Sequence, residues 1–217
     1  MSIVLAIETS TANCAVSIVG DGVLYAQAEL APQQHAQLML PMVQQALLTT
    51  GLEANQIDAL AFGEGPGAFT GLRIAAGLVQ GLALGWNKPV IAVSTLSALA
   101  YQGFMRTREL KWQACLDARM GEFYTQYCEF DANGVLINAT DAQLLPAKSL
   151  KAGWAGQNGI GDIQPSYPEL AEAFGVWLDD VPNAQSVAIL ALAQIDKAQT
   201  LQQCIPQPIY LRPSVAT

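Results

Sequence analysis

Charged residues are scarce in this chain, and their scarcity bounds what the surface can do. Of the 217 residues, 13% are charged and 52% are apolar, which is a low charge content for a soluble protein. A chain of this length can bury a substantial core and still have apolar surface left over. We therefore expect one large domain or two modest lobes, with part of the apolar surface covered by a partner.

Histidine and paired cysteines are also scarce, which limits metal and redox chemistry. His35 is the single histidine, and Met39 stands where a helical H-x-x-x-H motif would need a second. The cysteines, at positions 14, 115, 128 and 204, form no C-x-x-C pair, so we expect free thiols in a reducing compartment. These absences disfavour a zinc site, and the lack of a G-x-S-x-G motif disfavours a serine hydrolase.

Long apolar runs and a basic leader are missing as well. No stretch approaches the roughly 18 unbroken apolar residues of a membrane span, and Met1–Val4 leads directly into a strand-like run. We expect a soluble, unsecreted cytoplasmic protein that does not contact the membrane.

The net charge of −8 disfavours broad, self-sufficient binding to nucleic acid, which depends on neutralising phosphates. The distribution is uneven, because no Asp or Glu occurs between Glu64 and Glu109. Four basic residues fall in that window, namely Arg73, Lys88, Arg106 and Arg108. A local basic face and a mostly buried segment with a few solvated cations are both compatible with this pattern.

The glycine-rich stretch Gly63–Arg73 follows a strand-like run and opens a helical pattern. Such a loop either cradles an anion on free backbone N–H groups or makes a tight strand-to-helix turn. It lacks the lysine of a Walker A motif, and no acidic residue follows at the distance that a dinucleotide site requires. We favour a turn that launches the helix at a fixed angle and keep anion binding as a minor hypothesis.

The first half of the chain predicts three strands followed by alternating helices and strands. Asp21-Gly22 predicts a two-residue hairpin, and in the strand that follows it we expect the apolar residues at 24, 26, 28 and 30 to be buried. The expected elements are strands 3–7, 14–19 and 23–30, helix 35–50, strand 57–62, helix 70–86, strand 89–93 and helix 95–104.

The two long helices have unusual faces. Helix 35–50 has an apolar arc wider than a surface helix needs, since leucines at 40, 47 and 48 add to the main apolar side, so two packing partners are expected. Helix 70–86 carries Gly77, Gly81 and Gly85 on a face separate from its core side. These glycines either permit close approach of another helix or face their own sheet, and we favour the first.

The second half repeats the order of the first with fewer elements. It predicts strands 112–117, 122–130 and 135–139, a loop at 154–162, a closing helix at 184–200 and an extended tail at 206–213. The simplest architecture is an α/β protein of two β-β-β-α-β-α lobes, 1–106 and 107–217, the second reduced. The last helix or the tail is free to pack back on the first lobe.

Two carboxylates are candidates for nucleotide chemistry. Glu8 ends the first strand of lobe one and Asp117 ends the first strand of lobe two, so a duplicated fold could bring both to a magnesium nucleotide. Hydrogen bonding to adjacent turns is an equally good role for each. The corner after Glu8 has no glycine that would let a phosphate approach the backbone.

Several motifs together resemble the TsaB (YeaZ) family, which takes part in making threonylcarbamoyladenosine next to the tRNA anticodon. The most specific of them is Gly65-Pro66-Gly67-Ala68-Phe69-Thr70-Gly71-Leu72-Arg73. The others are Ile7–Thr11, Gln34-His35, Asp117–Glu122 and Pro208–Arg212. The resemblance spans nearly the whole chain.

This resemblance implies an actin-like (ASKHA) two-lobed fold and a non-catalytic role beside the paralogue TsaD. It also implies that a TsaE-like ATPase docks on the pair and that tRNA is reached through the complex. No cofactor is expected in the isolated chain, and ATP or ADP with magnesium is expected only in the complex. The isolated chain is expected to be a homodimer.

The resemblance also suggests site residues, and two other functions stay open as alternatives. The expected partner-binding residues are His35, Leu38, Met39, Met42, Arg73, Gly77, Gly81 and Gly85. An actin-like ATPase or kinase would instead use Glu8, Thr9, Ser10 and Asp117 with magnesium. A metallopeptidase is the third hypothesis and lacks ligands in the sequence.

Overall fold

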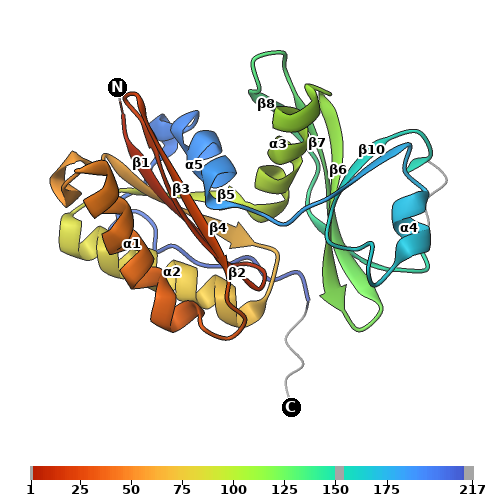
Figure 1. Cartoon of the computed structure of the whole chain (residues 1–217), viewed down its shortest axis with the longest axis horizontal. Helices are drawn as coiled ribbons and strands as arrows, with labels where there is room; N and C mark the ends of the chain where they lie inside the picture. Colours follow the sequence, from red (N-terminus) through yellow and green to blue (C-terminus); the bar gives the residue numbers. More distant parts are fainter. Residues whose placement is uncertain (1, 150–153, 213–217) are drawn as a thin grey trace. The chain divides into compact units, whose positions relative to one another are not determined.

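The computed structural model describes residues 2–149 and 154–212, and the chain separates into two compact units (Figure 1). The first unit comprises the residues up to Thr95 together with Asn183–Pro208. The second comprises Leu96–Pro182 and the tail from Ile209. The closing helix therefore returns to the first unit, an option that the sequence left open.

These units differ in outline from the lobes expected at 1–106 and 107–217, because helix α3 (Thr95–Thr107) groups with the second unit. Aromatic packing explains the grouping. The ring of Phe104 on α3 lies 5.6 Å from that of Phe130, and Gly103 packs so closely on Trp112 that a Cβ would lie 2.5 Å from its ring.

The first unit is built on a five-stranded sheet in the order β3-β2-β1-β4-β5. Strands β1, β2 and β3 are antiparallel, whereas β4 runs parallel to both β1 and β5. The strands are β1 (Val4–Glu8), β2 (Asn13–Gly20), β3 (Val23–Leu30), β4 (Ala59–Gly65) and β5 (Val90–Ser94). The predicted hairpin is confirmed, since Asp21 and Gly22 have φ of 48° and 78°.

The prediction for the face of β3 was wrong. The residues at 24, 26, 28 and 30 are exposed, with Leu24 64% and Leu30 74% exposed, while Val23 and Tyr25 pack against the core. Strand β2 decides the face, because its core residues Val16 and Ile18 pair with Gln27 and Tyr25. Alternation alone shows that a strand has two faces and does not say which one is buried.

Two long helices cover one face of this sheet (Figure 1). They are α1 (His35–Thr50) and α2 (Phe69–Trp86), and both lie where the apolar periodicity predicted them. They share one core with Ile7 and Phe62. Gly51, with φ of 69°, caps the C-terminal end of α1. In the described part of the chain, no helix is both long enough and apolar enough to cross a bilayer.

Helix α5 (Ala184–Leu192) covers the opposite face of the sheet and packs mainly on β1 and β2. It starts where expected, because the Asn183 side chain accepts a 2.8 Å hydrogen bond from the Ser186 N–H. It is shorter than the predicted helix 184–200. After the helix the chain passes through a 3-10 turn at Ile195–Lys197, and Gln199 then forms a β-bridge with Val90 on the edge of β5.

The second unit holds a six-stranded sheet in the order β11-β10-β6-β7-β8, with β9 also paired to β7. The predicted loop at 154–162 is wrong in part, because residues 158–161 form β10 between β6 and β11. The elements are β6 (Lys111–Arg119), β7 (Glu122–Phe130), β8 (Leu136–Ala139), β9 (Gln143–Pro146), β10 (Asn158–Gly161), α4 (Pro168–Glu172) and β11 (Val176–Asp179).

Candidate functional site

The glycine loop packs directly against the corner that follows β1. A Cβ on Gly63 would lie 1.9 Å from Glu8 Oε2, and one on Gly67 would lie 2.6 Å from Ser10 Cβ. A Cβ on Gly71, in the first turn of α2, would lie 1.9 Å from the Thr9 carbonyl oxygen. The glycines are thus required because the chain itself approaches the loop closely.

Hydrogen bonds join the loop and the corner at both ends of this contact. The Ala68 N–H donates to the Ser10 carbonyl at 2.7 Å, and the Thr9 hydroxyl donates to the Gly71 carbonyl at 2.8 Å. One oxygen of Glu8 accepts from the Ser10 N–H at 2.5 Å. Burial raises the pKa of Glu8, while the hydrogen bond from the Ser10 N–H acts to lower it.

The corner that makes this contact consists of Glu8, Thr9 and Ser10, which were expected to bind a nucleotide. Glu8, Thr9 and Ser10 are at most 2% exposed, and the groups just described bond to the loop or to one another. The corner therefore fixes the position of the glycine loop and of the first turn of α2. A nucleotide role for these residues stays a prediction.

The outer faces of α1 and α2 form a candidate surface, here called the α1–α2 face. The helices lie side by side on the sheet (Figure 1), and Arg73 is the only Asp, Glu, Lys or Arg in either of them. Surface helices normally carry charged residues on their solvent side. The exposed residues of the face are Gln37, Leu40, Pro41, Gln44 and Leu48 on α1, and Arg73, Gly77, Gly81, Leu84 and Gly85 on α2.

Gly77, Gly81 and Gly85 lie on this face. A Cβ added at any of them would meet no atom within 4 Å, and all three are exposed, so they do not face their own sheet. Interior helix glycines cost about 1 kcal/mol each relative to alanine. The fold of the unit does not require them, since nothing in the described chain occupies the space beside them.

Four of the expected partner-binding residues lie elsewhere. Met39 is 1% exposed and Met42 is 4% exposed, and both pack in the core of the first unit. His35 is 8% exposed, and its Nε2 lies 2.9 Å from the Thr11 carbonyl, to which it donates a hydrogen bond. Leu38 is half-buried against the same core. These side chains stabilise α1 on its sheet and do not belong to the exposed face.

Of the leucines on this face, Leu40 and Leu48 belong to the wide apolar arc predicted for helix 35–50, whereas Leu84 was not predicted. Leu40, Leu48 and Leu84 are 45%, 77% and 76% exposed. A signal for Leu84 was available in the sequence, because helix 70–86 contains a single charged residue and still has a leucine outside its core stripe. Arg73, which was expected on this face, is exposed, and its guanidinium carbon lies 3.9 Å from the centre of the Phe69 ring.

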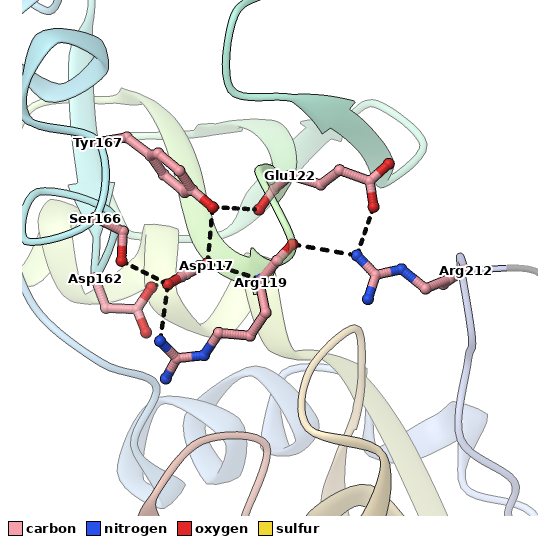
Figure 2. A network of polar contacts seen from close by, with 7 residues as sticks. All are labelled: Asp117, Arg119, Glu122, Asp162, Ser166, Tyr167 and Arg212. Atoms are coloured by element: carbon pink, nitrogen blue, oxygen red, sulfur yellow. Dashed lines mark hydrogen bonds and ion pairs between the residues drawn. The ribbon is translucent and has the colours of Figure 1, made fainter.

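In the second unit, Asp117 is the centre of a polar network (Figure 2). Its carboxylate accepts hydrogen bonds from the Ser166 hydroxyl at 2.8 Å and from the Arg119 N–H at 2.7 Å. The Arg119 guanidinium lies 3.1 Å from it, and the Tyr167 hydroxyl 3.3 Å. Asp117 therefore holds the turn between β6 and β7, in which Arg119 and Met120 have positive φ of 63° and 57°.

The C-terminal tail joins the same turn. Arg212 Nη2 lies 2.5 Å from Glu122 Oε2 and 3.3 Å from the Arg119 carbonyl oxygen (Figure 2). Beneath the turn, the Asp162 carboxylate accepts a 2.7 Å hydrogen bond from the Asp117 N–H. Burial, reinforced by the Asp117 charge, raises the pKa of Asp162 to about 6. In the described residues, no three His, Cys, Asp or Glu side chains are grouped as a metal site would require.

Comparison with known proteins identifies the family. The model of the TsaD family, tRNA N6-adenosine threonylcarbamoyltransferase, matches residues 22–174. The tRNA threonylcarbamoyladenosine biosynthesis protein TsaB of Escherichia coli is 37% identical, over 98% of this chain and 96% of that protein. The chain belongs to the TsaB family. The TsaB of Haemophilus influenzae is 34% identical, over 97% of this chain and 94% of that protein.

Solved structures agree with this assignment to the TsaB family. The structure of YeaZ from Pseudomonas aeruginosa superposes with a TM-score of 0.87 at 34% identity, over 97% of this chain and all of that one. The resemblance seen in the sequence is thereby confirmed, and so is the expected actin-like (ASKHA) α/β fold. The comparisons thus establish the family of this chain and its fold.

The glycines of α2 test the packing described above, because Gly71 contacts the corner after β1 and Gly77 has open space beside it. We expect Gly71→Ala to destabilise the chain by more than about 2 kcal/mol, because its Cβ would overlap the Thr9 carbonyl. We expect Gly77→Ala to stabilise it by roughly 0.5–1 kcal/mol, because the new methyl group meets open space in a helix. Urea unfolding of both variants measures the difference, and equal stabilities would contradict the packing described here.

The raised pKa of Asp162 predicts a pH dependence of stability. A carboxyl group whose pKa is higher in the folded chain stabilises the fold when protonated, and this contribution is lost as pH rises from about 4 through about 6. Asp162→Asn keeps an acceptor for the Asp117 N–H and cannot ionise. We expect it to be more stable than the wild type at pH 8, by up to about 3 kcal/mol, and to lose that advantage near pH 4.

Thermal melts at pH 4, 6 and 8 measure this effect. Asp141→Asn, at an exposed position of the same unit, is the control for general charge removal. A stability difference between Asp162→Asn and the wild type that is the same at every pH would refute the assigned pKa shift.

Proposed function

We propose that this chain is a non-catalytic, cytoplasmic subunit in the formation of threonylcarbamoyladenosine on tRNA, and that its α1–α2 face binds a TsaD-like catalytic subunit. Its relatives are named as biosynthesis proteins of this modification. One observation carries the choice of surface. The α1–α2 face combines exposed leucines with three helix glycines that have open space beside them.

Small residues on a helix face determine how closely a second helix can approach it. A glycine face lets another helix come close, and the apolar area on both sides is then removed from water at about 25 cal/mol per Å². The near absence of charge means that little desolvation opposes the contact. The partner suited to this face therefore presents apolar helices of its own, as a paralogue with the same fold would.

Further members of the assembly follow from the same proposal. A TsaE-like ATPase docks on the pair, tRNA is reached through the complex, and ATP or ADP with magnesium binds only there. When its partner is absent, this chain uses the α1–α2 face to form a homodimer. The net charge of −8 supports tRNA binding through the complex, since the chain alone is a poor ligand for phosphates.

Leu84 tests the proposed face without disturbing the core, because its side chain is 76% exposed. We expect Leu84→Arg to weaken binding to a TsaD-like partner by at least tenfold, since it places a charge in an apolar contact. Gly81→Leu should act in the same direction by blocking close approach. Isothermal titration calorimetry and co-elution measure both effects.

Ile137→Arg is the matched control, because Ile137 is also an exposed aliphatic residue, 60% exposed, and lies on β8 in the second unit. We expect this variant to bind like the wild type. Unchanged affinity of both Leu84→Arg and Gly81→Leu, with melting temperatures preserved, would rule out this face.

The alternative function is an actin-like ATPase or kinase that uses Glu8 and Asp117 with magnesium. The contacts of both carboxylates with their own turns favour a structural role for each. We expect calorimetry of the isolated chain with magnesium ATP to show no tight binding and no turnover. Tight binding that is lost in Asp117→Ala would restore the enzymatic hypothesis and remove the non-catalytic one.

A further inference from the structure

Strand β3 is an open edge of the first sheet, whereas the opposite edge is paired at its first residue, Val90. At β5, the Val90 N–H donates to the Gln199 carbonyl at 2.7 Å, and the Gln199 N–H donates to the Val90 carbonyl at 2.9 Å. At β3, every described pairing is to β2 on the inner side. Open strand edges pair readily with other strands, and proteins usually protect them.

The hairpin register determines which backbone groups of β3 face outward. Gly20 pairs with Val23 across the two-residue turn, so the odd-numbered residues from Val23 to Glu29 exchange hydrogen bonds with β2. The even-numbered residues, Leu24 to Leu30, therefore direct their N–H and C=O groups away from the sheet. In the described part of the chain, none of these outward groups has a hydrogen-bond partner.

The same four residues form an exposed apolar row. Leu24 and Leu30 are 64% and 74% exposed, and the alanines between them are exposed as well. Helix α5 packs mainly on β1 and β2 and leaves a hollow of about 210 Å³ beside the row, lined partly by Ala26, Ala28 and Asn183. No charged residue of β3 stands in the row, because Glu29 points to the other face.

We propose that β3 pairs antiparallel with β3 of a second copy of this chain, with Gln27 on the two-fold axis. In this register Leu24 lies opposite the second copy's Leu30, and Ala26 opposite the second copy's Ala28. All four outward-facing residues then exchange backbone hydrogen bonds, and the two sheets become one. Isologous pairing of this kind needs only a self-complementary strand.

The sequence of β3 selects this register over its neighbours. Glu29 lies opposite the second copy's Tyr25, so no like charges face each other. An axis at Glu29 would oppose two carboxylates, and an axis at Ala26 or Ala28 would leave a leucine without its apolar partner. The pairing is separate from the α1–α2 face and does not depend on the proposed function.

Cysteine cross-linking tests the register directly. Residues on the two-fold axis at a position without hydrogen bonds have Cα atoms about 4.5 Å apart, which a disulfide spans. We expect Gln27→Cys to give a covalent dimer on mild oxidation, in a chain that also carries Cys204→Ser and Leu84→Arg. These changes remove the exposed native thiol and the other proposed dimer contact.

Three comparisons make the outcome decisive. Ala26→Cys and Ala28→Cys should cross-link when mixed and only poorly when alone, because each lies opposite the other. Asp141→Cys, at an exposed site of the second unit, measures random collision. Adding Ala26→Pro to Gln27→Cys should abolish the cross-link and keep the melting temperature, because it removes an N–H that points away from β2.

Cross-linking of Gln27→Cys at the rate of Asp141→Cys, in a folded chain, would overturn the proposal. So would a cross-link that persists at full rate with Ala26→Pro. Sedimentation of the Leu84→Arg chain without cysteine substitutions completes the test, since we expect a concentration-dependent dimer that Ala26→Pro converts to monomer.

Discussion

The contact between the corner after β1 and the glycine loop is the constraint on which the first unit depends. A Cβ added at Gly63, Gly67 or Gly71 would lie only 1.9–2.6 Å from an atom of Glu8, Ser10 or Thr9, which is too close for a side chain. Because Gly71 already belongs to α2, this contact fixes the start and direction of the helix. A motif that looks like a phosphate cradle is in this way used to hold a helix against its own sheet.

The direction of α2 in turn decides which residues reach the surface. Its alanines, Leu72 and Val79 face the core, and Gly77, Gly81 and Gly85 face outward beside α1. Glycines therefore have two different surroundings in one segment: those near the loop contact the chain's own atoms, and those further along have open space beside them, which we propose another molecule fills. The proposed contact explains why the helix keeps glycines that lower its stability in isolation.

Much of the fold could be predicted from the sequence, because local signals were strong. The hairpin at Asp21-Gly22, both long helices and the strands β6 and β7 lie where periodicity and turn chemistry placed them. The predictions that were wrong concerned features that depend on tertiary contacts. The buried face of β3 is set by its register with β2, and β10 is hidden in sequence because Gly159 makes room for Trp177, which would contact a Cβ at 2.6 Å. Similarly, burial of Met39 and Met42 depends on the rotation of α1, which a wide apolar arc leaves undetermined.

The central claim is that the α1–α2 face is left open for a TsaD-like subunit. Hydrogen–deuterium exchange of this chain, alone and mixed with such a subunit, tests it most directly, because protection upon binding reports which backbone becomes covered. We predict slower exchange in peptides covering residues 35–50 and 69–86, with little change in β6 to β8. Protection confined to the second unit, or no protection at saturating partner, would contradict it.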